Sequence, residues 1–275
     1  MNDRNYSKKD ICAVIVSYNP DGIIIKNVNA LLPQVDRCFV VDNGSAGNEV
    51  IQKLKTMSNV VVKCLGYNTG IAHALNEGLD YCVANNYPLI LTMDQDTVLN
   101  PDCATNLLVA MEKYDAYSVG INWDSTTGKD EEVNYLITSG NLVNVTAAKN
   151  IGGFDEKLFI DSVDFDFSLR LKDAGFKIIK VASAGAKHNL GEEQKTGYLT
   201  HSVQRYYYIY RNHFYITHKH WKKHKVFCIK KWVALIIDYG KIILFDREKK
   251  EKQATLKRSY HDYKMMKKQW VESND

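Results

Sequence analysis

Proline and uninterrupted hydrophobic stretches are both scarce in this sequence. Only 4 of its 275 residues are proline and 16 are glycine, which leaves no room for a low-complexity linker, and we find no internal repeat. The apolar stretch 229–245 is interrupted by Lys230, Lys231, Asp238 and Lys241, so it is too short and too charged to span a bilayer. With 45% hydrophobic and 25% charged residues, the chain should form one sizeable core with an appendage, or two small domains.

Closely spaced pairs of cysteines are also missing, and we expect no secretory leader. The six cysteines lie at positions 12, 38, 64, 82, 103 and 228, mostly within apolar runs, and form no C-x-x-C pair. Buried, reduced thiols of a cytoplasmic protein explain this spacing better than disulfides do. Because the polar segment Met1–Asp10 lacks the apolar region of a signal peptide, we expect a cytoplasmic protein.

Two common nucleotide-binding fingerprints are absent. No G-x-G-x-x-G follows the first apolar run, and no Walker sequence of P-loop proteins occurs. These absences argue against dinucleotide-dependent hydride transfer and against NTP hydrolysis of the P-loop kind.

Acidic and basic residues are unevenly distributed along the chain, although its net charge is only +4. Residues 1–204 hold 18 Lys and Arg against 25 Asp and Glu, whereas residues 205–275 hold 18 against 7. An acidic body with a basic tail predicts an anionic partner for the tail, such as a membrane surface or nucleic acid.

The first hundred residues contain a repeated alternation of apolar runs and helical patterns. Strands are expected at Ile11–Ser17, Asp36–Val41, Val60–Lys63 and Leu89–Met93. Helices are expected between them, up to Leu32, over Asn48–Met57 and over Ile71–Asn85. This alternation of strands and helices predicts an α/β fold with a parallel, doubly wound sheet. Because Asn, Asp, Gly or Ser follows each strand, the strand ends should form a polar pocket that suits a nucleotide.

Two carboxylates, Asp94 and Asp96, follow the strand at Leu89–Met93. Side chains alternate along an extended segment, so both should point the same way. Hard oxygen ligands at a strand end suit Mg²⁺ or Mn²⁺, particularly when substrate phosphates complete the coordination. Taken alone, Asp-x-Asp is more often simple turn chemistry.

A second group of carboxylates lies further along the chain. Before it, we expect a helix from Asn100 to Tyr114 and strands at Tyr117–Ile121, Val133–Ser139 and Asn141–Val145. Asp161, Asp164 and Asp166 then lead into a helix over Phe167–Gly175. A structural explanation is available, in which Asp161 or Ser162 caps this helix and Asp164 lies in its first turn.

The C-terminal segment is aromatic, apolar and rich in lysine. Val203, Tyr206, Tyr207, Tyr210 and Phe214 recur with helical spacing, which packing explains by default. We expect a helix lying in the membrane interface, with a helical dimer interface as the alternative. Nucleic acid is not expected as a partner, since the tail contains no known binding module.

Several motifs stand in a specific order within residues 11–190. They are Val16-Ser17-Tyr18-Asn19, Val41-Asp42-Asn43-Gly44-Ser45, Asn68-Thr69-Gly70-Ile71-Ala72, Asn76-Glu77-Gly78, Met93-Asp94-Gln95-Asp96, Ser139-Gly140, Gly152-Gly153-Phe154-Asp155-Glu156 and Phe159-Ile160-Asp161 with Asp164, Asp166 and Arg170. Together they resemble family 2 of the inverting nucleotide-sugar glycosyltransferases, most of all bacterial rhamnosyltransferases of polysaccharide and O-antigen assembly. The resemblance implies an A-type glycosyltransferase fold, with a catalytic domain at 1–200 and a helical tail at 201–275.

The resemblance also implies how a nucleotide-sugar donor is bound. Ser17, Tyr18 and Asn19 would line the base and ribose, and Asp42 would accept a hydrogen bond from the pyrimidine ring. The other donor-binding positions that it implies are Asn68 over the nucleotide, Asp94 at the ribose, and Gln95.

A metal ion and a catalytic base complete the implied site. Asp96 would bind Mg²⁺ or Mn²⁺ on the diphosphate, and His188 matches a histidine that often serves as a further ligand, although a lone histidine is more often structural. The base would be Asp164, which takes the proton of the attacking hydroxyl. Many relatives have Glu directly before this base, whereas this chain has Val163, so Asp166 and, less favoured, Asp161 stay open as rivals.

The resemblance predicts transfer of L-rhamnose from dTDP-rhamnose to a hydroxyl of a cell-surface polysaccharide or O-antigen glycan acceptor, either free or linked to a lipid. UDP-galactofuranose, UDP-glucose or UDP-galactose are alternative donors, and a nucleotidyltransferase is an alternative activity. The latter normally needs a glycine-rich and basic loop after the first strand, which residues 17–22 do not provide. We expect the protein at the inner face of the membrane, as a monomer or as a homodimer.

Overall fold

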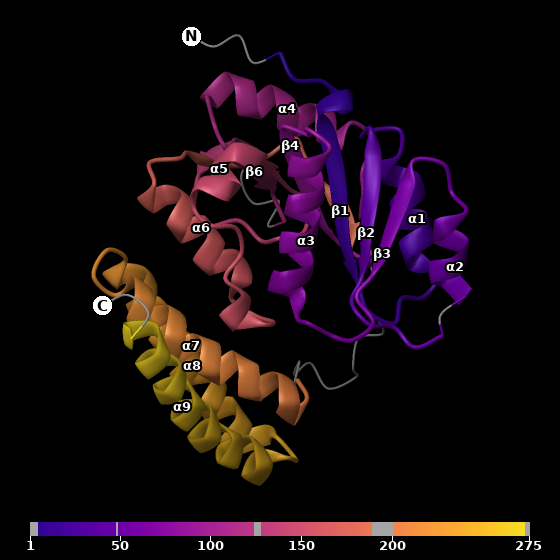
Figure 1. The fold of residues 1–275 in the computed structure, drawn as a ribbon. Helices are drawn as coiled ribbons and strands as arrows, with labels where there is room; N and C mark the ends of the chain where they lie inside the picture. The colour runs from indigo at the N-terminus through magenta and orange to yellow at the C-terminus, as the bar shows by residue number, and fades with distance from the viewer. Residues whose placement is uncertain (1–4, 48, 124–127, 189–200, 273–275) are drawn as a thin grey trace. The chain divides into compact units, whose positions relative to one another are not determined.

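A computed structural model describes residues 5–47, 49–123, 128–188 and 201–272 of the chain (Figure 1). It divides into two compact units. The first unit comprises Met1–Phe159 and Val163–Gly191, and the second, helical unit comprises Glu192–Asp275 together with Ile160–Ser162. Each unit is described by itself below.

The first unit is built on a mixed, mostly parallel sheet. Its strands are β1 (Ile11–Ser17), β2 (Arg37–Asp42), β3 (Val60–Cys64), β4 (Leu89–Asp94), β6 (Ser118–Ile121), β7 (Glu131–Glu132), β8 (Asn141–Asn144) and β9 (Ile178–Val181). They are arranged in the order β3-β2-β1-β4-β8-β6-β9-β7. The neighbours from β3 to β4 pair in parallel, whereas β8 is antiparallel to both β4 and β6. A separate pair is formed by β5 (Thr97–Leu99) and β10 (Ala186–His188). The expected A-type α/β fold is therefore confirmed.

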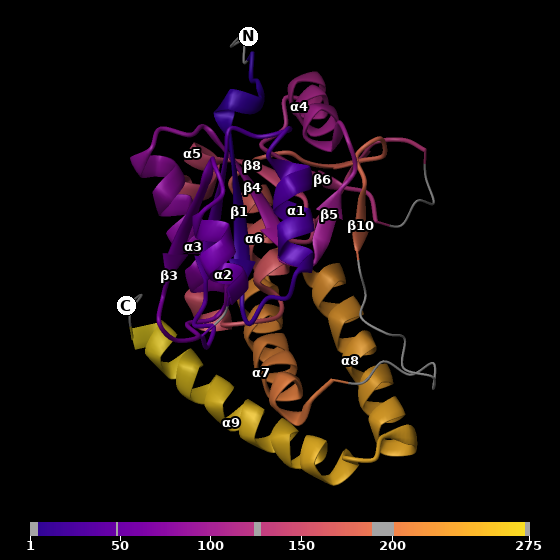
Figure 2. The same ribbon diagram turned by 90° about the vertical axis from the view of Figure 1, so that its right-hand side faces the viewer.

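Helices cover both faces of this sheet (Figures 1 and 2). They are α1 (Ile23–Leu31), α2 (Glu49–Lys55), α3 (Ile71–Ala84), α4 (Cys103–Tyr114), α5 (Val145–Asn150) and α6 (Val163–Asp173). Ile24 and Val28 of α1 share a buried core with Ile11 and Ile15 of β1. On the opposite face α3 approaches closely, because a Cβ added to Gly78 would lie 2.2 Å from Cγ1 of Val14. Alternate residues of β1 thus serve two helical layers, which explains its nearly continuous apolar sequence.

The expected strand at Val133–Ser139 is wrong. The strand that forms here, β7, covers Glu131–Glu132 and pairs with β9, and one further backbone hydrogen bond joins the Val133 N–H to the Ile178 carbonyl at 3.0 Å. At Leu136, the backbone N–H donates to the Ser168 hydroxyl of α6 at 3.2 Å, and Tyr135 packs edge-on against Phe165 with ring centroids 4.6 Å apart. Side chains of α6 therefore take the contacts that a neighbouring strand would have supplied, a tertiary effect that local propensity does not encode.

The second unit contains the helices α7 (Val203–His220), α8 (Lys225–Phe245) and α9 (Lys249–Glu272). Ser202 caps α7 by accepting a hydrogen bond from the Arg205 N–H. The expected aromatic stripe is a packing stripe in its centre, since Tyr206 and Tyr210 are buried with Ile242 of α8. Within the residues that the structure describes, no helix is both long and apolar enough to cross a membrane.

Polar contacts also hold the second unit together. The Asn212 side chain of α7 donates to the carbonyls of Ile160 and Asp161, at 2.6 and 3.0 Å. The ammonium of Lys252, fully buried, lies 2.6 Å from the Asp246 carboxylate. Both charges of this pair are removed from water on folding, so substituting either one should be destabilising, because the other charge would stay buried.

The buried His213 of α7 makes the stability of the protein depend on pH. Burial, reinforced by Lys231, lowers the pKa of His213 to about 4. A histidine with an ordinary pKa near 6.5 in the unfolded chain binds a proton there first, so the free energy of unfolding should fall by about 2 kcal/mol between pH 7.5 and pH 5.

His213→Phe should remove this part of the pH dependence, because phenylalanine has no proton to gain. Urea unfolding of wild type and variant at both pH values measures the difference. His261→Phe, at a largely exposed position of α9, is the matched control and should keep the wild-type slope. Equal pH slopes for wild type and His213→Phe would contradict the assignment.

Candidate active site

The register of three strands aligns the polar residues predicted at their ends. In the parallel pair β1 and β2, Ser17 lies opposite Asp42. In the parallel pair β1 and β4, Val16 lies opposite Asp94. Ser17, Asp42 and Asp94 are therefore brought to one edge of the sheet, the carboxyl edge, where ligands of open α/β sheets bind.

Side chains join the loops that follow β1 and β4. The Tyr18 N–H donates to Oε1 of Gln95 at 2.9 Å, and the Gln95 amide donates back to the Tyr18 carbonyl at 3.4 Å. This double hydrogen bond fixes the backbone of Tyr18 while its ring stays 49% exposed. An exposed ring on a fixed backbone is suited to stacking against a planar ligand.

A similar connection joins the loops after β1 and β2. The Asn19 N–H donates to the Ser45 hydroxyl at 2.8 Å, and the Ala46 N–H donates to the Asn19 side chain at 3.2 Å. The Ser45 hydroxyl in turn donates to the carboxylate of Asp42. Asp42 is nearly buried, so this hydrogen bond helps to keep its carboxylate in place as an acceptor.

Asn43 holds the loop that precedes α3. Its side chain donates to Oδ1 of Asn68 at 3.1 Å and accepts from the Thr69 N–H at 2.8 Å. Neighbouring Gly44 has φ +89°, and a Cβ there would lie 2.4 Å from the Tyr67 carbonyl carbon. Only glycine fits this approach without a shift of the backbone. Asn43 and Ser45, which were not among the predicted site residues, thus position Asn68 and Asp42.

The two carboxylates span the start of a turn, which we call the acidic turn (residues 94–96), so the expectation of an extended segment is wrong. Strand β4 ends at Asp94, and Gln95 and Asp96 turn the chain into β5. The reason is tertiary: Gln95 binds the β1 loop, and β5 pairs with β10. The backbone of Asp94 is fixed by Ser139, which accepts from its N–H at 3.1 Å, and by Asn27, which donates to its carbonyl at 2.8 Å.

The carboxylates of this turn fit a hard metal ion. Asp94 is exposed and Asp96 half-buried, and carboxylate oxygens at a strand end are ligands that Mg²⁺ and Mn²⁺ accept. The pairing of β10 with β5 sets the backbone of His188 opposite Thr97, directly after Asp96. The chain thus brings the predicted histidine position beside the acidic turn, although the His188 side chain lies outside the described part.

The glycine-rich segment before α6 is attached to α3. Asn76 of α3 accepts from the Phe154 N–H at 2.8 Å and donates to the Phe154 carbonyl at 2.9 Å and to Glu156 at 2.8 Å. Gly70 at the start of α3 has φ +89°, and a Cβ there would lie 2.6 Å from the Phe159 ring. These contacts tie the segment that leads to α6 to the same helix that follows Asn68.

The three carboxylates around the start of α6 have different surroundings. Asp166 is fully buried and accepts from Nε of Arg170 at 2.7 Å. Asp161 lies in the second unit and accepts from Arg205 at 3.2 Å, with φ +64° instead of the extended φ of an N-cap. Asp164, in the first turn of α6 as expected, is half-buried, and one of its oxygens accepts from the Phe165 N–H at 2.9 Å.

The ion pair of Arg170 with Asp166 has a structural role. Its two terminal nitrogens donate to the carbonyls of Ile151 and Gly153, at 2.6 and 2.7 Å. The guanidinium therefore joins α6 to the end of α5 and to the glycine turn, with Asp166 as its counter-charge.

Arg170→Met should lower the free energy of unfolding by about 3–5 kcal/mol, because it removes the guanidinium that is the counter-charge of the buried Asp166. Denaturant unfolding measures the change. Lys149→Met, which breaks an exposed ion pair with Asp80, serves as control and should cost at most about 1 kcal/mol. Equal losses for the two variants would refute the structural role of the Asp166–Arg170 pair.

Comparisons with known proteins find relatives of this chain. The family model of glycosyl transferase family 2 matches residues 12–164. The chain is 29% identical over 241 residues to the dTDP-rhamnosyl transferase RfbF of Shigella flexneri, covering 76% of this chain and 80% of that protein. It is 23% identical to the poly-beta-1,6-N-acetyl-D-glucosamine synthase of Staphylococcus aureus (strain MSSA476), over 61% of this chain and 47% of that one.

Solved structures share the fold. Residues 1–349 of S. aureus TarS in complex with UDP-GlcNAc superpose with a TM-score of 0.65 at 16% identity, over 92% of this chain and 80% of that one. GalNAc-T7 with UDP, GalNAc and Mn²⁺ superposes with a TM-score of 0.58 at 13% identity, over 76% of this chain. The chain spans only 50% of that structure.

Proposed function

Because the chain belongs to glycosyl transferase family 2, we propose that this glycosyltransferase moves L-rhamnose from dTDP-rhamnose to a hydroxyl of a cell-surface polysaccharide or O-antigen glycan. The observation that carries the donor is the likeness to a dTDP-rhamnosyl transferase over three quarters of the chain. UDP-galactofuranose, UDP-glucose and UDP-galactose are the alternatives, because a 29% identical relative leaves room for another donor.

In this proposal the joined loops at the sheet edge bind the nucleotide. The exposed Tyr18 ring, between Ser17 and Asn19, lies against the base, and Asp42 accepts a hydrogen bond from the ring N–H. The loop that covers the nucleotide is supported by two hydrogen bonds, from the Thr69 N–H to the Asn43 side chain and from the Gly70 N–H to the Asn68 side chain. Asp94 holds the ribose, and Gln95 keeps its loop against that of Tyr18.

The acidic turn holds the divalent ion, Mg²⁺ or Mn²⁺. Asp96 is the proposed ligand, and His188 is the proposed further ligand from the neighbouring strand. When bound, the ion neutralises the charge that develops on the departing diphosphate. The chain itself contributes a fixed turn, because Ser139, Asn27 and the β5–β10 pair restrain its backbone.

Asp164 is the proposed base. Inversion requires a carboxylate that takes the proton of the acceptor hydroxyl while that oxygen attacks the anomeric carbon. Asp166 is buried with Arg170, and Asp161 is engaged by Arg205, so each of these rivals has a structural partner of opposite charge. Asp164 has the partial exposure that contact with an acceptor needs.

Asp164→Asn should reduce turnover at least about a hundredfold, because the amide cannot take the proton, while donor affinity stays near wild type. Turnover of the sugar donor and calorimetric titration with the nucleotide measure the two quantities. Asp173→Asn, exposed on the same helix, is the control and should leave turnover unchanged. Turnover of the Asp164→Asn variant at the wild-type level would show that another residue is the base.

Thermal-shift screening against dTDP-rhamnose and UDP-sugars, with Mn²⁺ or with EDTA, tests donor and metal together. A ligand at 100 times its Kd adds about 2.7 kcal/mol to the stability of the native form. We expect the largest shift with dTDP-rhamnose and Mn²⁺, and a smaller one after chelation or in Asp96→Asn. A larger shift with a UDP-sugar would identify that sugar nucleotide as the donor in place of dTDP-rhamnose. Shifts that do not change on chelation would argue against a role for the metal ion.

We also propose that the enzyme works at the inner face of the cell membrane, on an acceptor carried by a lipid. The basic excess of residues 205–275 supports this location, since the acceptor of a growing surface glycan would be presented at an anionic surface. In this division of labour, residues 1–200 form the catalytic domain and 201–275 bind the surface.

A further inference from the structure

Helix α8 is an apolar helix that the protein leaves largely uncovered. Of its 21 residues, Cys228 and Ile242 are the buried ones among those the structure describes. Large apolar side chains elsewhere on the helix are exposed, with Val226 at 69%, Ile236 at 66% and Leu244 at 70%. A contiguous apolar surface of this kind marks an interaction site.

The exposed side chains form one face. Val226, Ile229, Val233, Ile236 and Leu244 recur at helical intervals of three, four or, across Gly240, eight residues. We call these residues, with Trp232, Ile237 and Ile243, the α8 face. Because the buried Cys228 and Ile242 lie on the other side of the helix, the α8 face points away from the packed interior of the helical unit. Trp232 is at the edge of this face, where its ring also packs against His213 of α7 with the ring centroids 4.6 Å apart.

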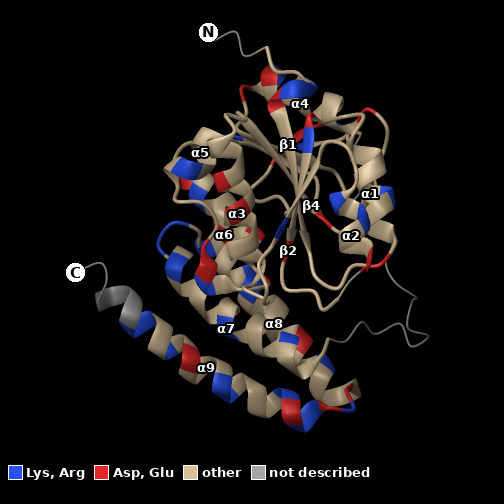
Figure 3. Cartoon of the chain, turned by 45° about the vertical axis from the view of Figure 1, so that its right-hand side comes forward, with Lys and Arg blue, Asp and Glu red and all other residues tan. Residues whose placement is uncertain are grey.

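Exposed basic side chains lie on α8, beside this face, and on the following helix α9. Lys225, Lys230 and Lys241 are exposed on α8 itself. Basic residues recur along α9 (Figure 3), where the exposed ones are Lys249, Lys250, Lys257, Arg258, Lys264, Lys267 and Lys268. An apolar face with lysines beside it has the composition of a helix that lies in a membrane interface.

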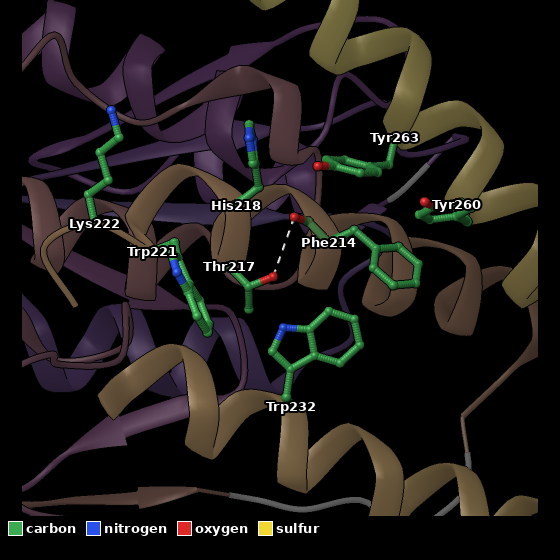
Figure 4. A pocket seen from close by; sticks show the side chains of 8 residues that line it. All are labelled: Phe214, Thr217, His218, Trp221, Lys222, Trp232, Tyr260 and Tyr263. Carbon is green, nitrogen blue, oxygen red and sulfur yellow. Dashed lines mark hydrogen bonds between the residues drawn. The ribbon is translucent and has the colours of Figure 1, made fainter. Parts of the chain in front are cut away.

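Aromatic rings mark one end of the face. A pocket of about 460 Å³ is lined by Phe214, Thr217, His218, Trp221, Lys222, Trp232, Tyr260 and Tyr263 (Figure 4). Three of its rings, those of Trp221, Trp232 and Tyr260, are 45%, 37% and 46% exposed. Partly exposed Trp and Tyr are the side chains that favour the level of lipid headgroups, with one end apolar and one wet. Trp232 belongs to both the pocket and the α8 face.

Charge decides between the two occupants that an apolar face can take. A second copy of the chain would bring another tail with 18 basic and 7 acidic residues against the first, and like charges repel. An anionic lipid surface attracts the same residues, at about 1 kcal/mol for each one near the surface. No described helix can cross the bilayer, so the fitting arrangement is a helix parallel to it.

We propose that α8 lies in the interface of an anionic bilayer, with the α8 face among the acyl chains. Trp221 and Trp232 lie at the level of the headgroups, and the lysines of α8 and α9 contact the lipid phosphates. This docking surface deepens the proposed membrane location, but it does not depend on which sugar donor the catalytic unit uses.

Flotation of the full-length chain with vesicles tests the proposal. Wild type should bind vesicles that contain phosphatidylglycerol and not those of phosphatidylcholine alone. The double variant Val233→Asp with Ile236→Asp should bind at least about tenfold more weakly, because two charges would enter the apolar layer. Both positions are exposed, so the helical unit should still fold, which circular dichroism checks.

A matched control substitutes exposed valines on helices of the first unit. Val83→Asp with Val109→Asp, at 46% and 57% exposure on α3 and α4, should bind vesicles like wild type. Hydrolysis of the sugar donor without vesicles should be equal in wild type and both double variants. A loss of vesicle binding can therefore be told apart from a loss of enzymatic activity. Equal binding by both double variants, or no binding by wild type, would overturn the proposal.

Two further measurements locate the surface. Tryptophan emission should shift to the blue on binding and be quenched by lipids brominated near the headgroup, and Trp232→Phe should reduce both effects. Light scattering of wild type should show no oligomer that Val233→Asp with Ile236→Asp dissociates. Such an oligomer, together with absent vesicle binding, would identify a second copy as the occupant and overturn the lipid assignment.

Discussion

The parallel pairing of β1 with β2 on one side and β4 on the other is the constraint on which the catalytic unit depends. It sets Ser17 opposite Asp42 and Val16 opposite Asp94, so three loops leave the sheet at the same edge. Each loop is then restrained by a side chain of another loop, as Gln95 restrains Tyr18. A shift of either pairing by one residue would turn the strand side chains to the opposite faces and separate the groups proposed to bind one nucleotide.

Charges in this molecule fall into two kinds, and their burial separates them. Asp166 with Arg170, and Lys252 with Asp246, are buried pairs that hold elements together. Such pairs are costly to break, which makes them poor candidates for proton transfer. Asp94, Asp96 and Asp164 keep some exposure and lie on or after turns that other residues fix, which suits groups that must meet a ligand.

Much of the fold was predictable because β1, β2 and β4 are buried almost throughout and therefore have nearly unbroken apolar sequences. The predicted residues at the strand ends were also brought together, because parallel strands share one carboxyl edge. The turn at Gln95 and Asp96 was not predictable, since it depends on the side-chain hydrogen bond to a loop 77 residues earlier in the chain. The prediction of a strand at 133–139 was wrong for a similar reason, because Leu136 is bound by Ser168, which lies far along the sequence. Local pattern also could not tell that α8 would stay uncovered, because an apolar helix has the same sequence whether it is buried or exposed.

The central claim is that the acidic turn after β4 holds a metal-bound nucleoside diphosphate. Crystals of the full-length chain grown with dTDP and manganese, measured at the manganese absorption edge, test it most directly. The account predicts an anomalous peak bonded to the Asp96 carboxylate and to the diphosphate, with the base beside Tyr18 and Asp42. A structure with no anomalous peak near Asp96, and with the Asp96 carboxylate directed away from the nucleotide, would contradict it.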